Sequence, residues 1–270
     1  MDLTEATERG LVLLGCGKMG SALLAGWLSR GVDPDAVQVI EPRPSDWLKG
    51  TGVGLNGPLP TAPSVVLLAV KPQMMAEALP QIAALAGPET LFVSIAAGTS
   101  LARLAGHLGD GASIVRAMPN TPAAVGRGIS ALIGNDRVAD AQMGLAEALM
   151  AAVGQTVRLE SEAQMDAVTA VSGSGPAYVF HLIETLAAAG EAQGLPADMA
   201  LHLARATVAG AGALAEAAEE DPATLRQNVT SPGGTTEAAL KVLMDPETGF
   251  PPLLRRTVAA AAARGKELDA

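Results

Sequence analysis

The protein is a chain of 270 residues in which 18 lysines and arginines stand against 28 aspartates and glutamates, so its formal net charge is −10. This acidic balance argues against nucleic acid and anionic membrane as partners, because both bind a cationic face. Hydrophobic residues make up 49% of the chain and charged residues only 17%, which is typical of a chain that folds. The length allows one large domain or two ordinary ones.

Membrane, secretory and metal-binding classes are also disfavoured. The uncharged run at residues 50–70 contains three prolines, which a membrane-spanning helix does not accommodate. The first ten residues, MDLTEATERG, place three acids before the first base, unlike a secretory signal, so we expect a cytoplasmic protein. The single cysteine, Cys16, cannot form an internal disulfide, and no metal site is expected because the three histidines lack ligand spacing.

The first part of the chain alternates short apolar runs with helical patterns. A helical stripe follows Gly20, and a second helix begins after Pro72, with Pro80 expected to interrupt it. Such alternation is typical of an α/β fold with a doubly wound parallel sheet of the Rossmann type. The predicted strands are residues 11–14, 37–40, 65–70, 91–94, 113–116, 129–133 and 156–159.

Beyond residue 160 the strand signals stop, and five helices are predicted at residues 176–189, 196–218, 222–228, 236–244 and 252–263. The sequence therefore predicts a dinucleotide-binding domain at residues 1–160 and an all-α domain at residues 161–270. These helices carry few charges, and a helix that is apolar on all sides must be covered. We expect the helical domain to pack against a second copy of itself, although an alanine-rich composition could also reflect base usage alone.

A glycine-rich loop follows the first predicted strand and opens a helix. Gly15, Gly17 and Gly20 give the GxGxxG spacing, in which the first glycine makes the turn, the second admits a pyrophosphate and the third allows close helix packing. The alternative is a glycine turn without a ligand. Cys16 in this loop could have a lowered thiol pKa beside the helix dipole or could simply fill space.

The second strand ends next to two charges that bear on the cofactor. Glu41 lies where an acid accepts the hydroxyls of the adenine ribose and repels a 2′-phosphate. Arg43, two residues later, could instead bind that phosphate, so NADH and NADPH both remain open. Both side chains could also be solvated loop charges.

Two clusters of serine and glycine precede helices in the second half. Residues 231–236, SPGGTT, would present backbone amides and the positive end of a helix dipole to a small anion, or could be an ordinary helix cap. Residues 172–176, SGSGP, have the same ambiguity. The helical domain offers no lysine or histidine in a motif suited to moving an alcohol proton, which favours an imine substrate that can bind already protonated.

Six motifs together identify a family resemblance: GCGKMG at 15–20, LAVKPQ at 68–73, SIAAGTS at 94–100, RAMPNTPAAVG at 116–126, VSGSGPAYVF at 171–180 and NVTSPGGTTEAAL at 228–240. The chain resembles pyrroline-5-carboxylate reductases almost from end to end. The resemblance implies an oxidoreductase that transfers hydride from NADPH or NADH to the imine of L-1-pyrroline-5-carboxylate, making L-proline in the last step of proline biosynthesis. It also implies a homodimer, often assembled further into a decamer.

The resemblance also assigns site residues. Thr236 would be the catalytic residue, as an orienter and proton relay at the ring nitrogen, in a substrate site with Glu162, Ser231, Gly234 and Thr235. The cofactor site would comprise Gly15, Cys16, Gly17, Lys18, Met19, Gly20, Glu41, Arg43, Asn56, Ala69, Val70, Lys71, Pro72, Ile95, Ala96, Ala97 and Asn228. The competing interpretations are a β-hydroxyacid dehydrogenase, which needs a lysine facing the nicotinamide, and a non-catalytic NAD(P)-sensing regulator.

Overall fold

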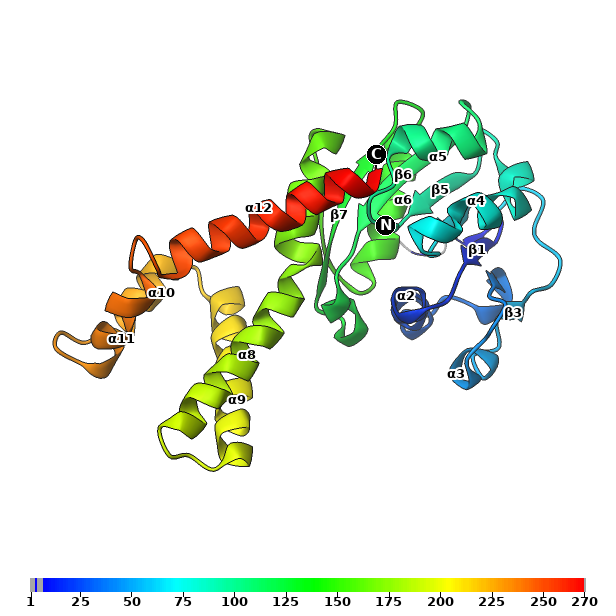
Figure 1. The fold of residues 1–270 in the computed structure, drawn as a ribbon. Coiled ribbons are helices and arrows are strands. Elements are labelled where there is room, and N and C mark those ends of the chain that lie inside the picture. Colours follow the sequence, from blue (N-terminus) through cyan, green and yellow to red (C-terminus); the bar gives the residue numbers. More distant parts are fainter. Residues whose placement is uncertain (1–2, 4–6, 270) are drawn as a thin grey trace. The chain divides into compact units, whose positions relative to one another are not determined.

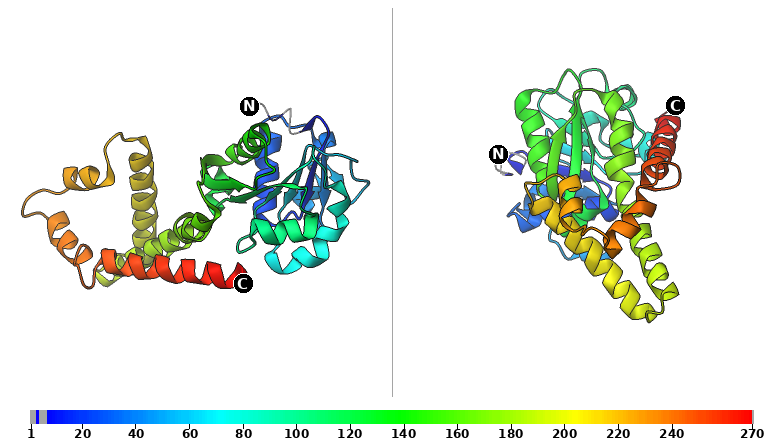
Figure 2. Two further views of the ribbon diagram at one scale, coloured as in Figure 1. Left: turned by 90° about the horizontal axis from the view of Figure 1, so that it is seen from above. Right: turned by 90° about the vertical axis from the view of Figure 1, so that its left-hand side faces the viewer.

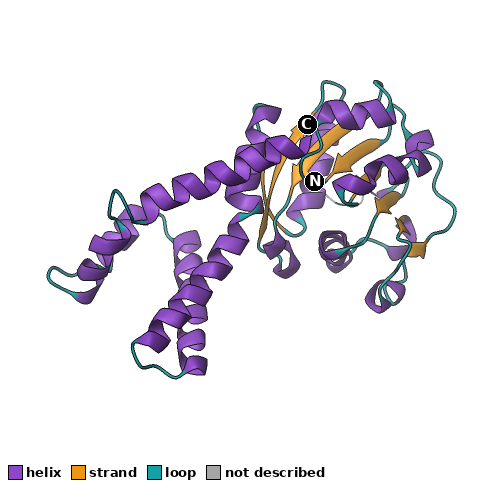
Figure 3. Ribbon diagram, viewed as in Figure 1, coloured by secondary structure: helices purple, strands orange, loops and turns teal. Residues whose placement is uncertain are grey.

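A computed structural model describes residue 3 and residues 7–269, so the predicted domain limits at residues 1 and 270 lie outside the described residues. The chain divides into two compact units, Met1–Gly173 with Ala261–Ala270, and Ser174–Ala260. We call them the sheet unit and the helical unit. The strands of the described residues all belong to the sheet unit, and the helical unit contains helices and loops (Figure 3). The predicted boundary at residue 160 stays a prediction.

The sheet unit is built on an eight-stranded sheet with the order β3-β2-β1-β4-β5-β6-β7-β8 (Figure 1). The seven predicted strands are confirmed, four of them with shifted ends. Strand β3 was not predicted, because two residues are too few to show a pattern in the sequence. The strands are β1 (Leu11–Leu14), β2 (Val37–Ile40), β3 (Gly54–Leu55), β4 (Val65–Leu68), β5 (Leu91–Ser94), β6 (Ser113–Met118), β7 (Gly128–Gly134) and β8 (Gly154–Arg158).

The sheet is parallel except at one pairing. Strand β7 runs antiparallel to β6, with Met118 opposite Ala131, whereas an all-parallel sheet was predicted. The connection explains the difference, because only residues 119–127 separate the two strands, and they include the short 3-10 helix Thr121–Val125. A parallel crossover needs a dozen or more residues, so this link can only return the chain in the opposite direction.

Helices cover both faces of the sheet, which confirms the doubly wound class. Alternate residues of β1 point to opposite faces: Leu11 and Leu13 join the core under α2 (Lys18–Ser29) and α6 (Asp140–Ala151), while Val12 and Leu14 join the other core. That second core contains residues of α4 (Met75–Ala78) and α5 (Leu101–Leu108). Figure 2 shows these two helix layers on opposite sides of the strands.

Proline interrupts the helix that follows β4, as predicted. The segment consists of the 3-10 helix Pro72–Met74, the single helical turn α4 and the 3-10 helix Leu79–Gln81, which contains Pro80. A proline at this position cannot donate the backbone hydrogen bond that would continue an α-helix. The interruption leaves short, tightly wound turns beside the end of β4.

The helical unit follows a short linking segment made of α7 (Met165–Val168) and the π-helix Thr169–Gly173. All five predicted helices are confirmed: the third has the predicted bounds, the ends of the others are shifted, and the last one is longer at both ends. They are α8 (Gly175–Ala192), α9 (Ala197–Ala217), α10 (Pro222–Asn228), α11 (Thr235–Leu243) and α12 (Phe250–Asp269).

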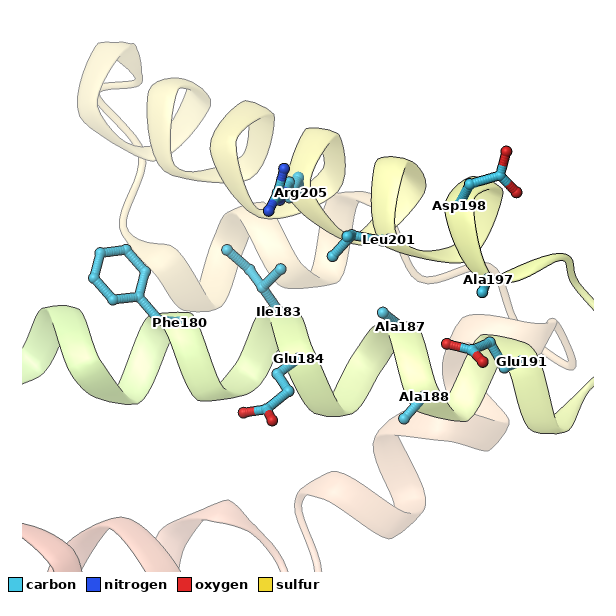
Figure 4. Close-up of a pocket in the computed structure, with 10 residues that line it drawn as sticks. All are labelled: Phe180, Ile183, Glu184, Ala187, Ala188, Glu191, Ala197, Asp198, Leu201 and Arg205. Atoms are coloured by element: carbon cyan, nitrogen blue, oxygen red, sulfur yellow. The ribbon is translucent and has the colours of Figure 1, made fainter.

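Helices α8 and α9 pack against each other yet leave most of their apolar side chains exposed. Only Ala187, Ala200 and Ala204 of the two helices are buried. A groove of about 650 Å³ lies along this pair, and in Figure 4 Ile183 and Ala187 of α8 point toward Leu201 of α9. Among the described residues, none of the helices combines the length and apolarity that a bilayer span requires.

Candidate active site

The glycine loop lies at the point of the sheet where the strand order reverses. Strands β2 and β4 flank β1 on its two sides, so the chain leaves β1 into an open crevice at the carboxyl ends of the strands. Gly15 has a φ of +88°, which favours glycine, and a Cβ there would lie 2.9 Å from Val70 Cγ1. The first position of the motif therefore requires glycine, both for its backbone conformation and because the loop after β4 leaves no room for a Cβ.

The remaining two glycines fit the roles that the spacing predicts. Nothing lies within 4 Å of the Cβ position of Gly17, so a ligand can approach the backbone there. A Cβ on Gly20 would lie 2.7 Å from the Gly15 carbonyl oxygen, so this position accepts only glycine at the observed spacing. Helix α2 begins at Lys18 without a side-chain cap or an acid in its first turn, which leaves its amides for an anion.

A cleft of about 370 Å³ opens beside this loop and brings together residues from three strand ends. Eight of the predicted cofactor residues line it: Gly15, Cys16, Gly17, Glu41, Arg43, Ala69, Val70 and Lys71. Strand β4 ends at Leu68, two residues earlier than predicted, because Ala69 and Val70 turn out of the sheet into the cleft wall. The cleft therefore combines apolar walls with uncapped amides and charges of both signs, as a dinucleotide requires.

Backbone amides hold the Glu41 carboxylate at the rim of this cleft. Glu41 Oε2 accepts a hydrogen bond of 2.9 Å from the Cys16 amide, and Oε1 accepts one of 3.0 Å from the Arg43 amide. Such a carboxylate is preorganised, because neither oxygen has to give up its position when a ribose hydroxyl approaches. Arg43 lines the same cleft, so charges that favour and disfavour a 2′-phosphate lie two residues apart.

Asn56 acts on the cofactor cleft through Glu41. Its Oδ1 accepts a hydrogen bond of 2.9 Å from the Glu41 amide, and its Nδ2 donates one of 3.0 Å to the Glu41 carbonyl oxygen. Asn56 has a φ of +50°, a conformation that asparagine tolerates better than most residues. The side chain thus fixes the backbone that carries the ribose-facing acid.

The thiol of Cys16 in the glycine loop has a raised pKa, whereas an activated cysteine has a lowered one. Burial raises the pKa of Cys16, and the nearby charge of Glu41 raises it further, although a hydrogen bond with Ser21 acts against both. The suggestion of a lowered pKa was therefore wrong, because burial and a neighbouring carboxylate both disfavour the charged thiolate. The side chain fills space between the loop and α2.

The other predicted cofactor residues lie outside the lining of this cleft. Lys18, Met19 and Gly20 form the first turn of α2, Pro72 begins the next 3-10 helix, and residues 95–97 follow the neighbouring strand β5. Asn228 ends α10 in the helical unit. The cleft also has lining residues that the motifs did not indicate: Leu14, Ile40, Pro42, Ser45, Met74, Glu77, Ala78 and Gln81. Only tertiary packing brings these to one place.

The predicted acid Glu162 has two strong partners within the sheet unit. Its Oε1 accepts a hydrogen bond of 2.5 Å from Arg116 Nη1 and one of 2.7 Å from the Leu101 amide. Arg116 lies in the buried strand β6 and is only 6% exposed. Sequence reasoning assigned this arginine no role, although a cation within an apolar strand already signals a buried partner.

In the helical unit, the SPGGTT segment forms a tight turn that leads into α11. Gly233 has a φ of +71°, the Gly234 amide donates to the Ser231 carbonyl oxygen at 3.0 Å, and the helix begins at Thr235. Gly234 occupies the cap position, and no side chain there accepts a hydrogen bond from the first turn. Glu237 Oε2 accepts a hydrogen bond of 2.5 Å from the Gly233 amide instead. The first-turn amides of Thr235 and Thr236 have no side-chain cap at Gly234, and the start of a helix attracts anions.

Comparison with known proteins agrees with both units. The family described as "Pyrroline-5-carboxylate reductase dimerisation" matches residues 162–268, and the family described as "NADP oxidoreductase coenzyme F420-dependent" matches residues 11–98. The chain thus has an NAD(P)-binding Rossmann unit and a dimerisation region, and the protein is a homo-oligomer.

Named relatives and solved structures cover nearly the full length. Pyrroline-5-carboxylate reductases of Pseudomonas aeruginosa and of Synechocystis are 41% and 42% identical, over 96% of this chain and 96% and 97% of theirs. The structure of a pyrroline-5-carboxylate reductase from Coxiella burnetii matches with a TM-score of 0.90 and 36% identity, over 97% of this chain and 99% of that one. That of the Plasmodium falciparum enzyme with NADP bound matches with a TM-score of 0.85 and 27% identity, over 98% and 99%. With the glycine-loop cleft and the SPGGTT turn in place, the chain belongs to the pyrroline-5-carboxylate reductase family.

Proposed function

We propose that this protein reduces the carbon–nitrogen double bond of L-1-pyrroline-5-carboxylate to give L-proline, with NADPH or NADH as the reductant. The observation that carries the proposal is the open cleft at the uncapped start of α2, in a chain that resembles such reductases along nearly its whole length. The two alternatives, a β-hydroxyacid dehydrogenase and a non-catalytic regulator, find no support among the named relatives.

The sheet unit would hold the dinucleotide. Gly15, Gly17 and the first turn of α2 present amides to the diphosphate, and Glu41 with Arg43 faces the adenine ribose. Residues 69–72 and 95–97 follow β4 and β5 and supply the wall for the nicotinamide half. The bound reductant supplies a hydride. The protein's own contribution is to fix its position and exclude water.

The turn before α11 would hold the substrate. The amides of Thr235 and Thr236 bind the carboxylate, and the Ser231 hydroxyl supports it, while Gly234, whose own amide donates to the Ser231 carbonyl oxygen, shapes the turn. The Thr236 hydroxyl orients the imine: it accepts a hydrogen bond from the ring nitrogen of an imine that binds protonated, and it relays a proton from water to an imine that binds neutral. This arrangement needs no lysine, because an imine that binds protonated requires no strong acid. Asn228 of the same unit would reach toward the dinucleotide.

We further propose that the homo-oligomer is a dimer built through the helical domain at residues 161–270, with a decamer as the larger assembly. The exposed apolar side chains of α8 and α9 support this proposal, because an isolated unit would leave them in water. The expected location is the cytoplasm.

The decisive experiment mixes the purified protein with NADH or NADPH and with pyrroline-5-carboxylate, and follows the absorbance of the reduced nicotinamide. We expect oxidation that requires the imine and yields proline by chromatography. Cofactor binding without turnover would favour the non-catalytic regulator. Oxidation of the cofactor with a β-keto acid but not with the imine would favour the β-hydroxyacid dehydrogenase.

A further inference from the structure

The inference concerns Arg116, Glu162 and the first amide of α5, which are joined by hydrogen bonds at the start of α5. Arg116 lies on β6 in register with Ser94, the last residue of β5. Because side chains alternate along a strand, Arg116 shares the sheet face of Ile114, which packs in the core with Leu104 and Leu108 of α5. The guanidinium therefore lies on the face that α5 covers.

Glu162 supplies the negative charge that Arg116 and the start of α5 lack. A buried guanidinium needs a carboxylate, and Glu162 Oε1 lies 2.5 Å from Arg116 Nη1. Helix α5 has no acid in its own first turn, and the same oxygen accepts a hydrogen bond of 2.7 Å from its first amide, that of Leu101. An acid 61 residues away in sequence thus completes the positive end of α5.

The segment between β5 and α5 is hydrogen-bonded at both ends and closely packed in the middle. The Ile95 amide donates to the Leu68 carbonyl oxygen at 3.1 Å, which ties its start to β4. Gly98 has a φ of +62°, and a Cβ there would lie 2.7 Å from Leu268 Cβ at the end of α12. Glu162 secures the far end through Leu101. Residues 95–97 between these points are the ones that would wall the nicotinamide half.

We propose that Glu162, neutralised by Arg116, is a positioning residue that fixes the β5–α5 segment for cofactor binding, without contacting the imine. The proposal rests on the function proposed above. It gives Glu162 a different task from the substrate-binding role that the family resemblance implies. Its consequence is a separation of effects: loss of the carboxylate weakens cofactor binding and turnover but spares the affinity for the imine.

The test compares Glu162→Gln with Glu147→Gln. Glu147 also pairs with an arginine, the more exposed Arg158 on β8, within the same unit but away from the β5–α5 segment. For Glu162→Gln we expect about a tenfold higher dissociation constant for the reduced cofactor, measured by its fluorescence, and a lower kcat, because small displacements of a positioning element have large effects on rate. The KM for the imine should change less than twofold. Glu147→Gln should leave all three values within twofold.

Hydrogen exchange gives a readout that does not need turnover. Peptides covering residues 95–108 should exchange faster in Glu162→Gln and remain unchanged in Glu147→Gln. Because Glu162→Gln leaves a buried cation unpaired, the double variant Arg116→Met with Glu162→Met is made as well. It removes both charges, which often preserves folding, and should show the same faster exchange and weaker cofactor binding.

Unchanged exchange and unchanged cofactor affinity in the folded variants would overturn the proposal. So would a rise in the KM for the imine with normal cofactor binding, since that pattern assigns Glu162 to the substrate. If the wild-type protein binds the cofactor but does not reduce the imine, the proposed function fails, and the exchange and cofactor-binding measurements still decide the role of Glu162.

Discussion

At the scale of single residues, the candidate site depends on atoms whose partners are distant in sequence. Glu41 is held by the amides of Cys16 and Arg43, and its backbone is held by Asn56. The sequence predicted an acid near the ribose, since the spacing from the glycine loop is characteristic. It could not predict that the Cys16 amide fixes the carboxylate or that Asn56 fixes the backbone, because those contacts form only when the loops after β1, β2 and β3 meet.

Replacing Glu41 by alanine should shift the cofactor preference toward NADPH. Its carboxylate repels a 2′-phosphate, and a change of about 1.4 kcal/mol in that repulsion corresponds to roughly tenfold. We expect the ratio of kcat/KM for NADPH to that for NADH to rise by about tenfold in steady-state kinetics. The control is Asp46→Ala, which removes the same charge from an exposed ion pair with Lys49. An equal shift in both variants would point to net charge alone.

Replacing Thr236 by alanine should lower turnover with the imine by about tenfold to a thousandfold, the effect of losing one preorganised hydrogen-bond donor. Thr236 lies in the first turn of α11, directly after the uncapped glycine turn. Thr257→Ala is the matched control, because that hydroxyl only bonds the Leu253 carbonyl oxygen within α12. A kcat equal to that of the wild type would remove Thr236 from the mechanism.

At the scale of elements, helix placement depends on close approaches that glycine permits. A Cβ on Gly26 of α2 would lie 2.5 Å from Val153 Cγ1 and 3.2 Å from the Ala152 carbonyl oxygen. The same layer is tied by the Trp27 indole, which donates to the Leu149 carbonyl oxygen at 2.9 Å. The helix that carries the phosphate-facing amides is therefore seated directly on the end of α6.

Gly26→Ala should lower the free energy of unfolding by about 1–3 kcal/mol, because overpacking outweighs the helix propensity that alanine adds. Gly106→Ala in α5 is the control, since nothing lies within 4 Å of its Cβ position. It should raise the free energy of unfolding by roughly 0.5–1 kcal/mol. Urea titrations of the two variants measure both changes, and a stabilised Gly26→Ala protein would contradict the packing argument.

At the scale of the whole molecule, the helical unit leaves apolar surface that its own helices do not cover. Exposed side chains include Phe180 at 62%, Met199 at 50% and Leu214 at 56%. Low charge along these helices predicted the exposure from the sequence, since the unit is too small to bury every side of each helix. The family described as "Pyrroline-5-carboxylate reductase dimerisation" matches residues 162–268, which include these helices.

Phe180→Asp should weaken the homo-oligomer, because a charge in an apolar interface must be desolvated without a partner. Phe180 lines the groove along α8 and α9 (Figure 4). Sedimentation velocity at micromolar concentration should show a larger fraction of monomer than in the wild type. Trp47→Asp in the sheet unit, where the indole is 45% exposed, should sediment like the wild type. Identical profiles for the two variants would exclude this groove from the interface.

The sequence by itself determined the order of strands and helices, the glycine loop, the break at Pro80 and the family, because local periodicity, backbone restrictions of glycine and proline, and motif order are all written along the chain. The tertiary structure decided the antiparallel return of β7, the lining of the cleft and the partners of Glu41 and Glu162. The return of β7 follows from where β6 ends, because only residues 119–127 are left for the connection. The cleft lining and the partners of the acids depend on groups far apart in sequence, such as Arg116 and Glu162, whose burial and mutual distance are set only when the strands and helices pack.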